Sequence, residues 1–136
     1  MTALRVLVAV TLALSALLKL FDFAAVAILF AMQLGLPDAI ARNLLGGLVI
    51  VELAAAILLL LPEPRLPKLY PALVVLFSTF LGATLWLGLK GSENCGCFGT
   101  LIPMTPLASA LKNVGLIVAT LVLWRHSANV RRVALT

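Results

Sequence analysis

Two cysteines stand one residue apart in this 136-residue chain, as Cys95-Gly96-Cys97. In an extended chain their Cα atoms would lie roughly 6–7 Å apart, whereas a disulfide usually needs about 4.4–6.8 Å. A bridge therefore requires a turn at Gly96, and glycine permits the unusual dihedral angles of such a turn. Because closing so small a loop stabilises a fold by only about 1.5 kcal/mol in the chain-entropy model, the spacing predicts a redox-active pair rather than a structural disulfide.

The residues around the pair favour access by another protein. Asn94, Phe98 and Gly99 complete a polar, glycine-containing segment. Two other interpretations stay open. The cysteines could be small apolar loop residues, or they could bind a soft metal, because thiolates favour Cu(I) and Zn²⁺. Two thiols are an incomplete tetrahedral set, and the one histidine, His126, is expected at the opposite membrane face, so we assign no metal site.

Two lysines are expected at the same level as the cysteines. Lys19 closes the first apolar run and Lys112 stands near the start of the last one. A nearby cation lowers the pKa of a thiol, so both lysines are expected to favour the thiolate. The alternative for each is that the side chain only snorkels to the membrane surface, which is the interpretation we favour for Lys90.

Glu52 lies roughly 13–18 Å from either end of its apolar run, close to mid-bilayer. A carboxylate there is costly and is a functional candidate by default. A proton route or a contact with a quinone headgroup would use it. The structural alternative is a neutral glutamic acid that forms a hydrogen bond with Ser78, Thr79 or Asn113 of another helix.

The composition indicates that lipid is the solvent for most of the chain. Hydrophobic residues make up 63% and charged residues 11%, against about 45–50% and about 25% in an average soluble domain. This excludes a soluble enzyme, a disordered chain and a nucleic-acid module. The net charge of +5 comes from basic residues at the ends of apolar runs, where topology and snorkelling place them, so no nucleic-acid partner is expected.

The apolar runs predict a single all-α membrane domain over residues 1–136, an integral four-helix bundle. A short apolar run, 23–36, ends at Gly35 and Pro37 and fits an additional interfacial helix after the first span. The first run also resembles a signal peptide with cleavage near Ala27, but Lys19 and Asp22 precede that position and favour a retained helix. The expected spans are 3–20, 40–61, 68–89 and 107–124, with a redox loop at 90–106 and a basic cytoplasmic tail at 125–136.

The distribution of Lys and Arg predicts that both termini face the cytoplasm. Six basic residues would lie inside and four outside; the inner ones are Arg5, Arg65, Lys68, Arg125, Arg131 and Arg132, and the outer ones Lys19, Arg42, Lys90 and Lys112. The cysteine loop would then lie on the extracytoplasmic side of a bacterial inner membrane, where a disulfide can persist.

Two features are expected to serve packing and anchoring alone. Gly46 and Gly47, with Ala54 and Ala55, form a small-residue face that predicts close helix packing. Trp86 and Trp124 lie near span ends and are typical of interfacial anchors.

These residues resemble one family of membrane proteins. The run Asn94-Cys-Gly-Cys-Phe-Gly99 is similar to the CGCFG hallmark of the MauE branch of the DoxX-like membrane proteins. Ser15-Ala-Leu-Leu-Lys19-Leu-Phe-Asp22 resembles the S-G-x-x-K-L-x-D that ends the family's first helix, with Ala16 in place of the usual glycine. Glu52 matches an acidic residue of the second helix, and Lys112-Asn113 resembles an R-N in the fourth, with lysine in place of the bidentate arginine.

The resemblance implies a four-helix membrane protein associated with thiol redox and with a periplasmic thioredoxin-like partner. The MauE member is tied to methylamine dehydrogenase maturation, a role that no residue here indicates. We expect thiol–disulfide exchange, in which one cysteine forms a mixed disulfide and the other resolves it. No covalent cofactor is expected; a membrane quinone is the natural electron sink or source. The expected site residues are Cys95, Cys97, Lys19, Lys112 and Glu52, supported by Asp22, Asn94, Gly96, Phe98, Gly99 and Asn113.

Two other classes of function stay open. The thiols could serve soft-metal binding or transport, of the Cu or Hg type. The chain could also be a non-enzymatic subunit that stabilises a larger membrane complex, or it could form a homo-oligomer.

Overall fold

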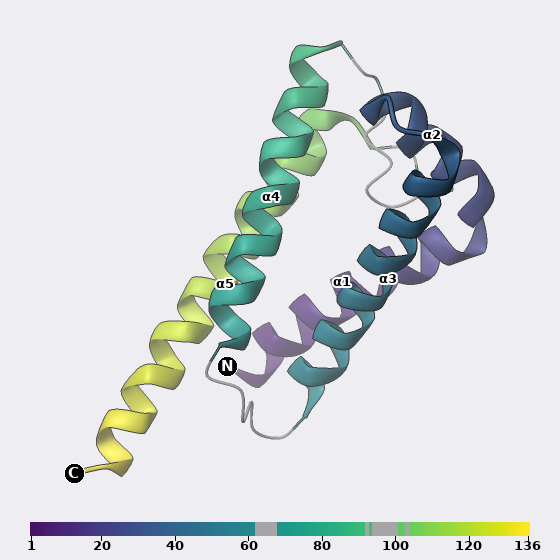
Figure 1. Cartoon of the computed structure of the whole chain (residues 1–136). Coiled ribbons are helices and arrows are strands. Elements are labelled where there is room, and N and C mark those ends of the chain that lie inside the picture. Colours follow the sequence, from purple (N-terminus) through teal and green to yellow (C-terminus); the bar gives the residue numbers. More distant parts are fainter. Residues whose placement is uncertain (62–67, 92, 94–100, 103) are drawn as a thin grey trace.

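A computed structural model describes residues 1–61, 68–91, 93, 101–102 and 104–136. Within these ranges the chain is helical and contains no strand. The helices are α1 (Thr2–Phe21), α2 (Phe23–Leu34), α3 (Asp38–Leu60), α4 (Leu69–Leu89) and α5 (Pro106–Ala134) (Figure 1). Of these, α1, α3, α4 and α5 are long and apolar enough to cross a membrane, and α2 is a shorter apolar helix. The expected all-α architecture, four spans with a short helix after the first, is therefore confirmed.

Residues at the helix ends explain where the chain turns. Gly35 follows α2 in the left-handed conformation, with φ of 63°, and its N–H donates to the carbonyl of Ala31. Glycine adopts this conformation without strain, which lets the chain reverse into α3. At the start of α5, the Thr105 hydroxyl accepts from the N–H of Ala108, and Pro106 occupies the first turn, as is common at helix starts.

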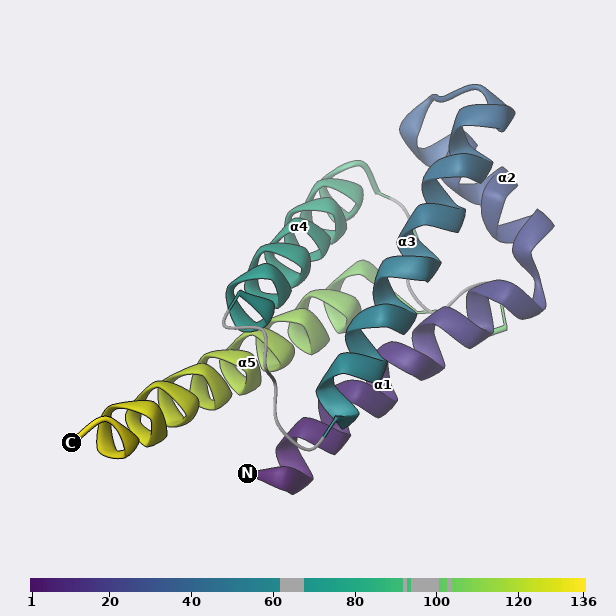
Figure 2. The same ribbon diagram turned by 60° about the horizontal axis from the view of Figure 1, so that its bottom comes forward.

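The helices form two groups that meet in one core. In the first group α1 and α2 pack on α3, and in the second α4 packs on α5 (Figures 1 and 2). Contacts between α1 and α5 join the groups. The main core lies in the half of the bundle nearer the termini, where it contains Val8, Leu12, Leu59, Phe77 and Leu123.

Arg5 ties the beginning of α1 to the end of α3. Its guanidinium donates to the carbonyl of Leu59 at 2.7 Å and to that of Leu61. The last carbonyls of a helix have no partner within the helix and carry its negative partial charge. The contact therefore joins α1 to α3 at the end of the bundle where the N-terminus lies.

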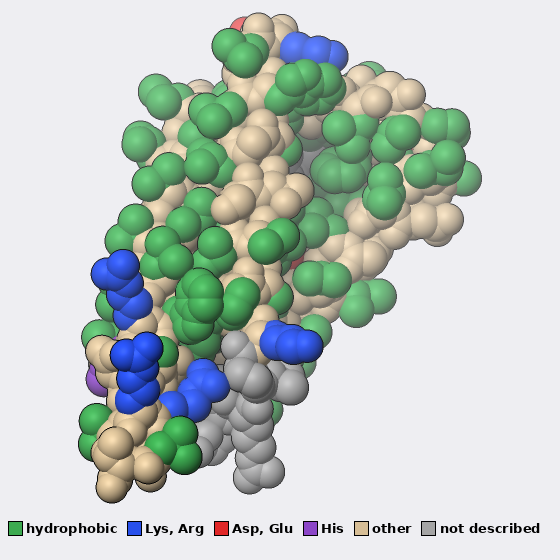
Figure 3. Space-filling view, turned by 60° about the vertical axis from the view of Figure 1, so that its left-hand side comes forward, with side chains coloured by type: hydrophobic (Ala, Val, Ile, Leu, Met, Phe, Trp, Pro, Cys, Tyr) green, Lys and Arg blue, Asp and Glu red, His purple; other side chains and the backbone are tan. Residues whose placement is uncertain are grey.

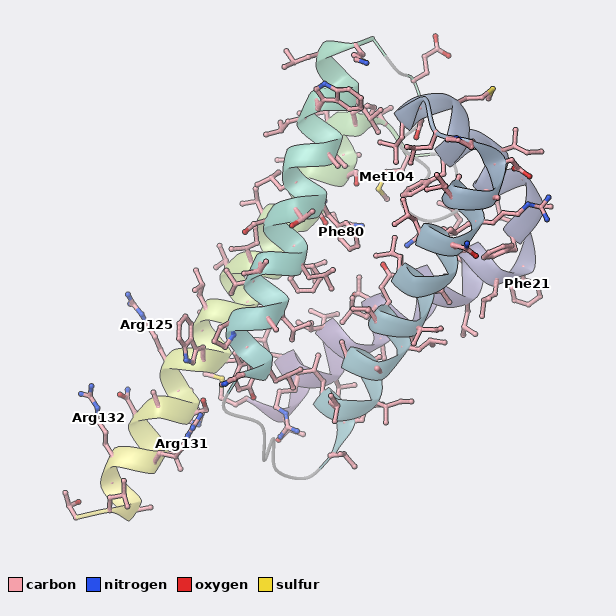
Figure 4. All side chains as sticks on the ribbon, in the orientation of Figure 1. Phe21, Phe80, Met104, Arg125, Arg131 and Arg132 are labelled. Carbon is pink, nitrogen blue, oxygen red and sulfur yellow. The ribbon has the colours of Figure 1, made fainter. Side chains whose placement is uncertain are left out.

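The helix α5 is longer than the expected fourth span. It has 29 residues, so at 1.5 Å per residue it extends well beyond a hydrocarbon layer about 30 Å thick. The residues expected as a basic tail form its last turns, and Arg125, Arg131 and Arg132 lie on this projecting part (Figure 4).

The surface is typical of a protein surrounded by lipid. Hydrophobic side chains cover the middle of the face drawn in Figure 3, and Lys and Arg side chains lie toward its two ends. Exposed apolar residues occur on every helix, including Leu7, Ile28, Ile50, Val75 and Val118. In a soluble protein so much exposed apolar surface would promote aggregation, whereas in a bilayer it faces acyl chains.

The expected close packing at Gly46 and Gly47 is wrong. A Cβ atom added at either residue would meet nothing within 4 Å. The residues of α3 that pack against other helices lie on a different face, at Leu45, Val49 and Glu52. The two glycines therefore make no close contact between the described helices, whereas Ala55 of the same predicted face is buried in the main core.

Candidate functional site

A buried ion pair joins the first two spans. Lys19 of α1 lies with its Nζ 2.9 Å from Oε1 and 3.0 Å from Oε2 of Glu52 in α3. The side chains are 4% and 1% exposed. A single ammonium thus contacts both carboxylate oxygens, which is the arrangement that offsets part of the cost of burying two charges.

Ser15 completes this cluster. Ser15 and Lys19 are four residues apart and therefore share one face of α1. The Lys19 ammonium donates to the Ser15 hydroxyl at 2.8 Å, and that hydroxyl donates to Oε1 of Glu52 at 3.3 Å. The Ser15 hydroxyl therefore bonds to both charged groups and helps to hold them in one geometry.

Glu52 does bond to another helix, as its structural alternative required, but the partners are Lys19 and Ser15 of α1 and not the residues suggested. Thr79 directs its hydroxyl to the carbonyl of Val75 instead. Both amide atoms of Asn113 lack a hydrogen-bond partner within the described part of the chain. Lys19 is buried, because the last turn of α1 runs beside the middle of α3, where Glu52 lies.

A cavity of about 300 Å³ opens beside the ion pair. It lies between the two helix groups, in the half of the bundle away from the main core. All five helices contribute to its walls. The residues that line it are Ser15, Lys19, Phe30, Gln33, Leu34, Leu44, Leu48, Glu52, Thr79, Phe80, Ala83, Thr84, Trp86, Leu87 and Lys112.

Aromatic rings and cations face each other in and beside this cavity. Phe80 extends from α4 toward α3 (Figure 4), and the Lys19 ammonium lies 5.9 Å from the centre of its ring. Trp86, expected as an interfacial anchor, also lines the cavity, and the Lys90 ammonium lies 3.9 Å from its ring. Such distances are typical of cation–π contacts, so the lysines hold the aromatic walls as well as supplying charge.

Polar residues of α5 approach the same region. Lys112 is half-buried and lines the cavity. The next residue, Asn113, is fully buried, as is Ser109 one turn earlier, and the Ser109 hydroxyl also lacks a partner within the described ranges. The predicted supporting residue Asp22 lies in the turn between α1 and α2, partly exposed.

The predicted redox residues themselves lie outside the described residues: Asn94, Cys95, Gly96, Cys97, Phe98 and Gly99. The chain that carries them leaves α4 after Leu89 and enters α5 at Pro106. Both of these helix ends lie at the cavity end of the bundle (Figure 1). The predicted effect of Lys19 and Lys112 on the thiols stays a prediction. Among the described residues, no three His, Cys, Asp or Glu side chains gather as a metal site.

Lys19, Glu52 and Lys112 were predicted from the sequence, whereas most of the other residues that line the cavity were not, among them Phe30, Gln33 and Phe80. Phe30 and Gln33 come from α2, and Phe80 comes from α4. Phenylalanine is common in apolar helices and gives no signal, whereas Gln33 is the one polar residue of α2 and could have been noticed. The position of Ser15, four residues before Lys19, could have predicted that the two side chains share one face of the helix.

Together these features define a multi-pass helical membrane protein with a charged, aromatic-lined cavity inside the spans. Residues 1–126 match the family described as methylamine utilisation protein MauE, and the chain belongs to that family. It is also similar to Protein TlpB of Flavobacterium psychrophilum, with 37% identity over 84 residues, 60% of this chain and 23% of TlpB. The chain thus matches less than a quarter of that relative's length. No solved structure matches the chain.

Proposed function

We propose that this protein exchanges thiols and disulfides at the extracytoplasmic face of the bacterial inner membrane. Its substrate would be a thioredoxin-like protein, and its redox centre the pair Cys95 and Cys97. Membership of the MauE family supports a redox-associated membrane role. The observation that carries the proposal is positional: the segment with the two cysteines connects α4 to α5, and the last turn of α4 and the second turn of α5 contribute to the cavity that Lys19 and Glu52 also line.

The exchange is a sequence of two displacements. The thiolate of one cysteine attacks the partner's disulfide, so that a mixed disulfide forms and one partner thiolate leaves. The second cysteine then attacks the mixed disulfide, which creates the Cys95–Cys97 bridge and releases the reduced partner. Two electrons and two protons pass from this protein to its partner, and the reverse order oxidises the partner.

Repeated turnover needs a second two-electron reaction on the membrane side. A membrane quinol that becomes a quinone supplies two electrons and two protons, and a quinone accepts the same number. Either direction restores the cysteine pair. Glu52 and Lys19, the buried charged groups beside the cavity, are the residues placed to accompany the protons.

Trapping the mixed disulfide tests the proposal. Cys97→Ser leaves Cys95 without its resolving partner, so membranes isolated without reductant should contain an adduct between Cys95 and an extracytoplasmic protein, released by dithiothreitol and identified by mass spectrometry. Cys95→Ser/Cys97→Ser is the control and should show no adduct.

Two results would contradict the proposed exchange. A soft-metal carrier would lose Cu(I) or Hg(II) uptake in the same single variant and trap no protein. A structural subunit would keep its function in both Cys95→Ser and Cys97→Ser and would still co-purify with its complex.

A further inference from the structure

We propose that the cavity between the helix groups binds the headgroup of a membrane quinone. The binding is independent of the cysteines, whereas the use of the bound quinone as an electron carrier rests on the proposed thiol–disulfide exchange.

The cavity opens on an apolar part of the outer surface of the bundle. Three residues of its wall are also exposed on the outside of the molecule: Leu44 is 50% exposed, Trp86 41% and Leu34 40%. They come from α3, α4 and α2, and mark an opening between these helices. A ligand that is dissolved in the bilayer can enter by this route without crossing water, while a long apolar tail stays among the acyl chains.

The walls suit a flat ring. Phe30, Phe80 and Trp86 line the cavity beside aliphatic side chains such as Leu48 and Leu87. Aromatic side chains favour offset or edge-to-face contacts with another ring. The volume of about 300 Å³ lies at the small end of the usual range for ligand pockets, so it suits a headgroup of one or two rings rather than a whole lipid.

The charged and polar residues that line the cavity favour a quinone over an acyl chain. Lys19, Glu52 and Lys112 line the cavity together with Ser15 and Thr79, whose hydroxyls donate to Glu52 and to the Val75 carbonyl. An ionisable side chain inside a membrane is costly, and an acyl chain would make no use of it. A quinone carbonyl accepts hydrogen bonds from an ammonium group, and Lys112 brings one to the lining. A pocket with a few convergent polar groups in apolar walls is the usual form of a small-molecule site.

Fluorescence of Trp86 can report the bound quinone. Full-length protein in nanodiscs is titrated with decylubiquinone and, separately, with menaquinone-4, both of which quench indole emission. In the Trp124→Phe background Trp86 is the remaining indole, and the expected quenching saturates. In Trp86→Phe the reporter is Trp124, at the other end of the bundle, and its quenching should rise linearly with quinone in the lipid.

Two variants test whether the saturable quenching comes from the cavity. Ala83→Phe fills it and should raise the half-saturating concentration about ten-fold or more, because overpacking a filled site is unfavourable. Val75→Phe adds the same ring to the lipid-facing side of α4, where Val75 is 67% exposed, and should change it less than about two-fold. Lys112→Met supplies a second test that leaves the cavity volume nearly unchanged, with an expected rise of about ten-fold, or 1.4 kcal/mol.

The outcomes separate this inference from the proposed exchange. Saturable quenching that persists in Cys95→Ser/Cys97→Ser and weakens in Ala83→Phe and Lys112→Met supports the quinone site, even if no mixed disulfide is trapped. Linear quenching of both tryptophans, unchanged in these variants, would overturn it and would leave an acyl chain as the occupant. A trapped partner would still support the exchange in that case.

Discussion

The Lys19–Glu52 pair is the contact whose removal should affect this fold most. At 2.9 Å and an effective dielectric constant near 20, the Coulomb attraction between two unit charges is about 6 kcal/mol. Much of it offsets the desolvation of the two groups. Lys19→Met leaves a carboxylate that is 1% exposed without its counter-ion, and breaking a buried pair in this way costs about 3–5 kcal/mol. Glu52→Leu strands the ammonium and should cost a similar amount.

A double-mutant cycle tests whether the two residues act as a pair. Lys19→Met/Glu52→Leu removes both charges, so its free energy of unfolding should return to near the wild-type value, because apolar replacements of a buried pair are often neutral or stabilising. The assay is unfolding of the purified chain by SDS in mixed micelles, followed by far-UV circular dichroism.

The exposed pair Asp38–Arg42 provides a matched control for this cycle. Its atoms are 3.1 Å apart but its side chains are 59% and 50% exposed. Its coupling should stay below about 1 kcal/mol. If the Lys19 and Glu52 substitutions were simply additive, so that the double variant were the least stable of all, the reasoning on the buried pair would be refuted.

Three further substitutions have defined expected effects in the same unfolding assay. Arg5→Gln should lower the free energy of unfolding by about 1.5–3 kcal/mol, because it removes charged donors from the last carbonyls of α3. The control Arg132→Gln, on the exposed end of α5, should change it by less than about 0.5 kcal/mol. Equal effects of the two substitutions would contradict a capping role for Arg5. Gly47→Ala should raise the free energy of unfolding by up to about 1 kcal/mol, because alanine favours the helix and its methyl group meets no neighbour there. A lower free energy of unfolding would contradict the open space found at Gly47. Asn113→Leu should not destabilise, because its amide has no partner among the described residues; a loss above about 2 kcal/mol would show that the amide is bonded.

Hydropathy predicted the spans because the chemistry of a bilayer leaves few alternatives. Apolar runs long enough to cross the membrane must satisfy their backbone internally, and Gly35 and Pro37 mark the end of the short helix α2. The residue at which α5 ends was harder to predict from the sequence. Polar residues follow Trp124, which is typical of a tail, yet no glycine or proline stands between Arg125 and Ala134 to stop a helix.

The site was predicted in its parts and not in its arrangement. Lys19 and Glu52 stand out in the sequence because charges are rare within apolar runs. Their pairing depends on the depth at which α1 ends beside α3, and that depth follows from α2 covering the upper part of α3. Tertiary packing of this kind leaves no mark in the spacing of residues along one helix. The aromatic residues of the cavity wall could not be predicted for the same reason.

The direct test of a redox-active pair is an equilibrium titration of its two thiols. The purified full-length protein is incubated in dithiothreitol or glutathione buffers of stepped potential, and Cys95 and Cys97 are counted by maleimide mass shift. The account predicts one reversible two-electron transition, with a midpoint more oxidising than about −300 mV, the level below which structural disulfides usually lie. Two thiols that stay reduced throughout, or a bridge that resists reduction at every potential, would contradict it.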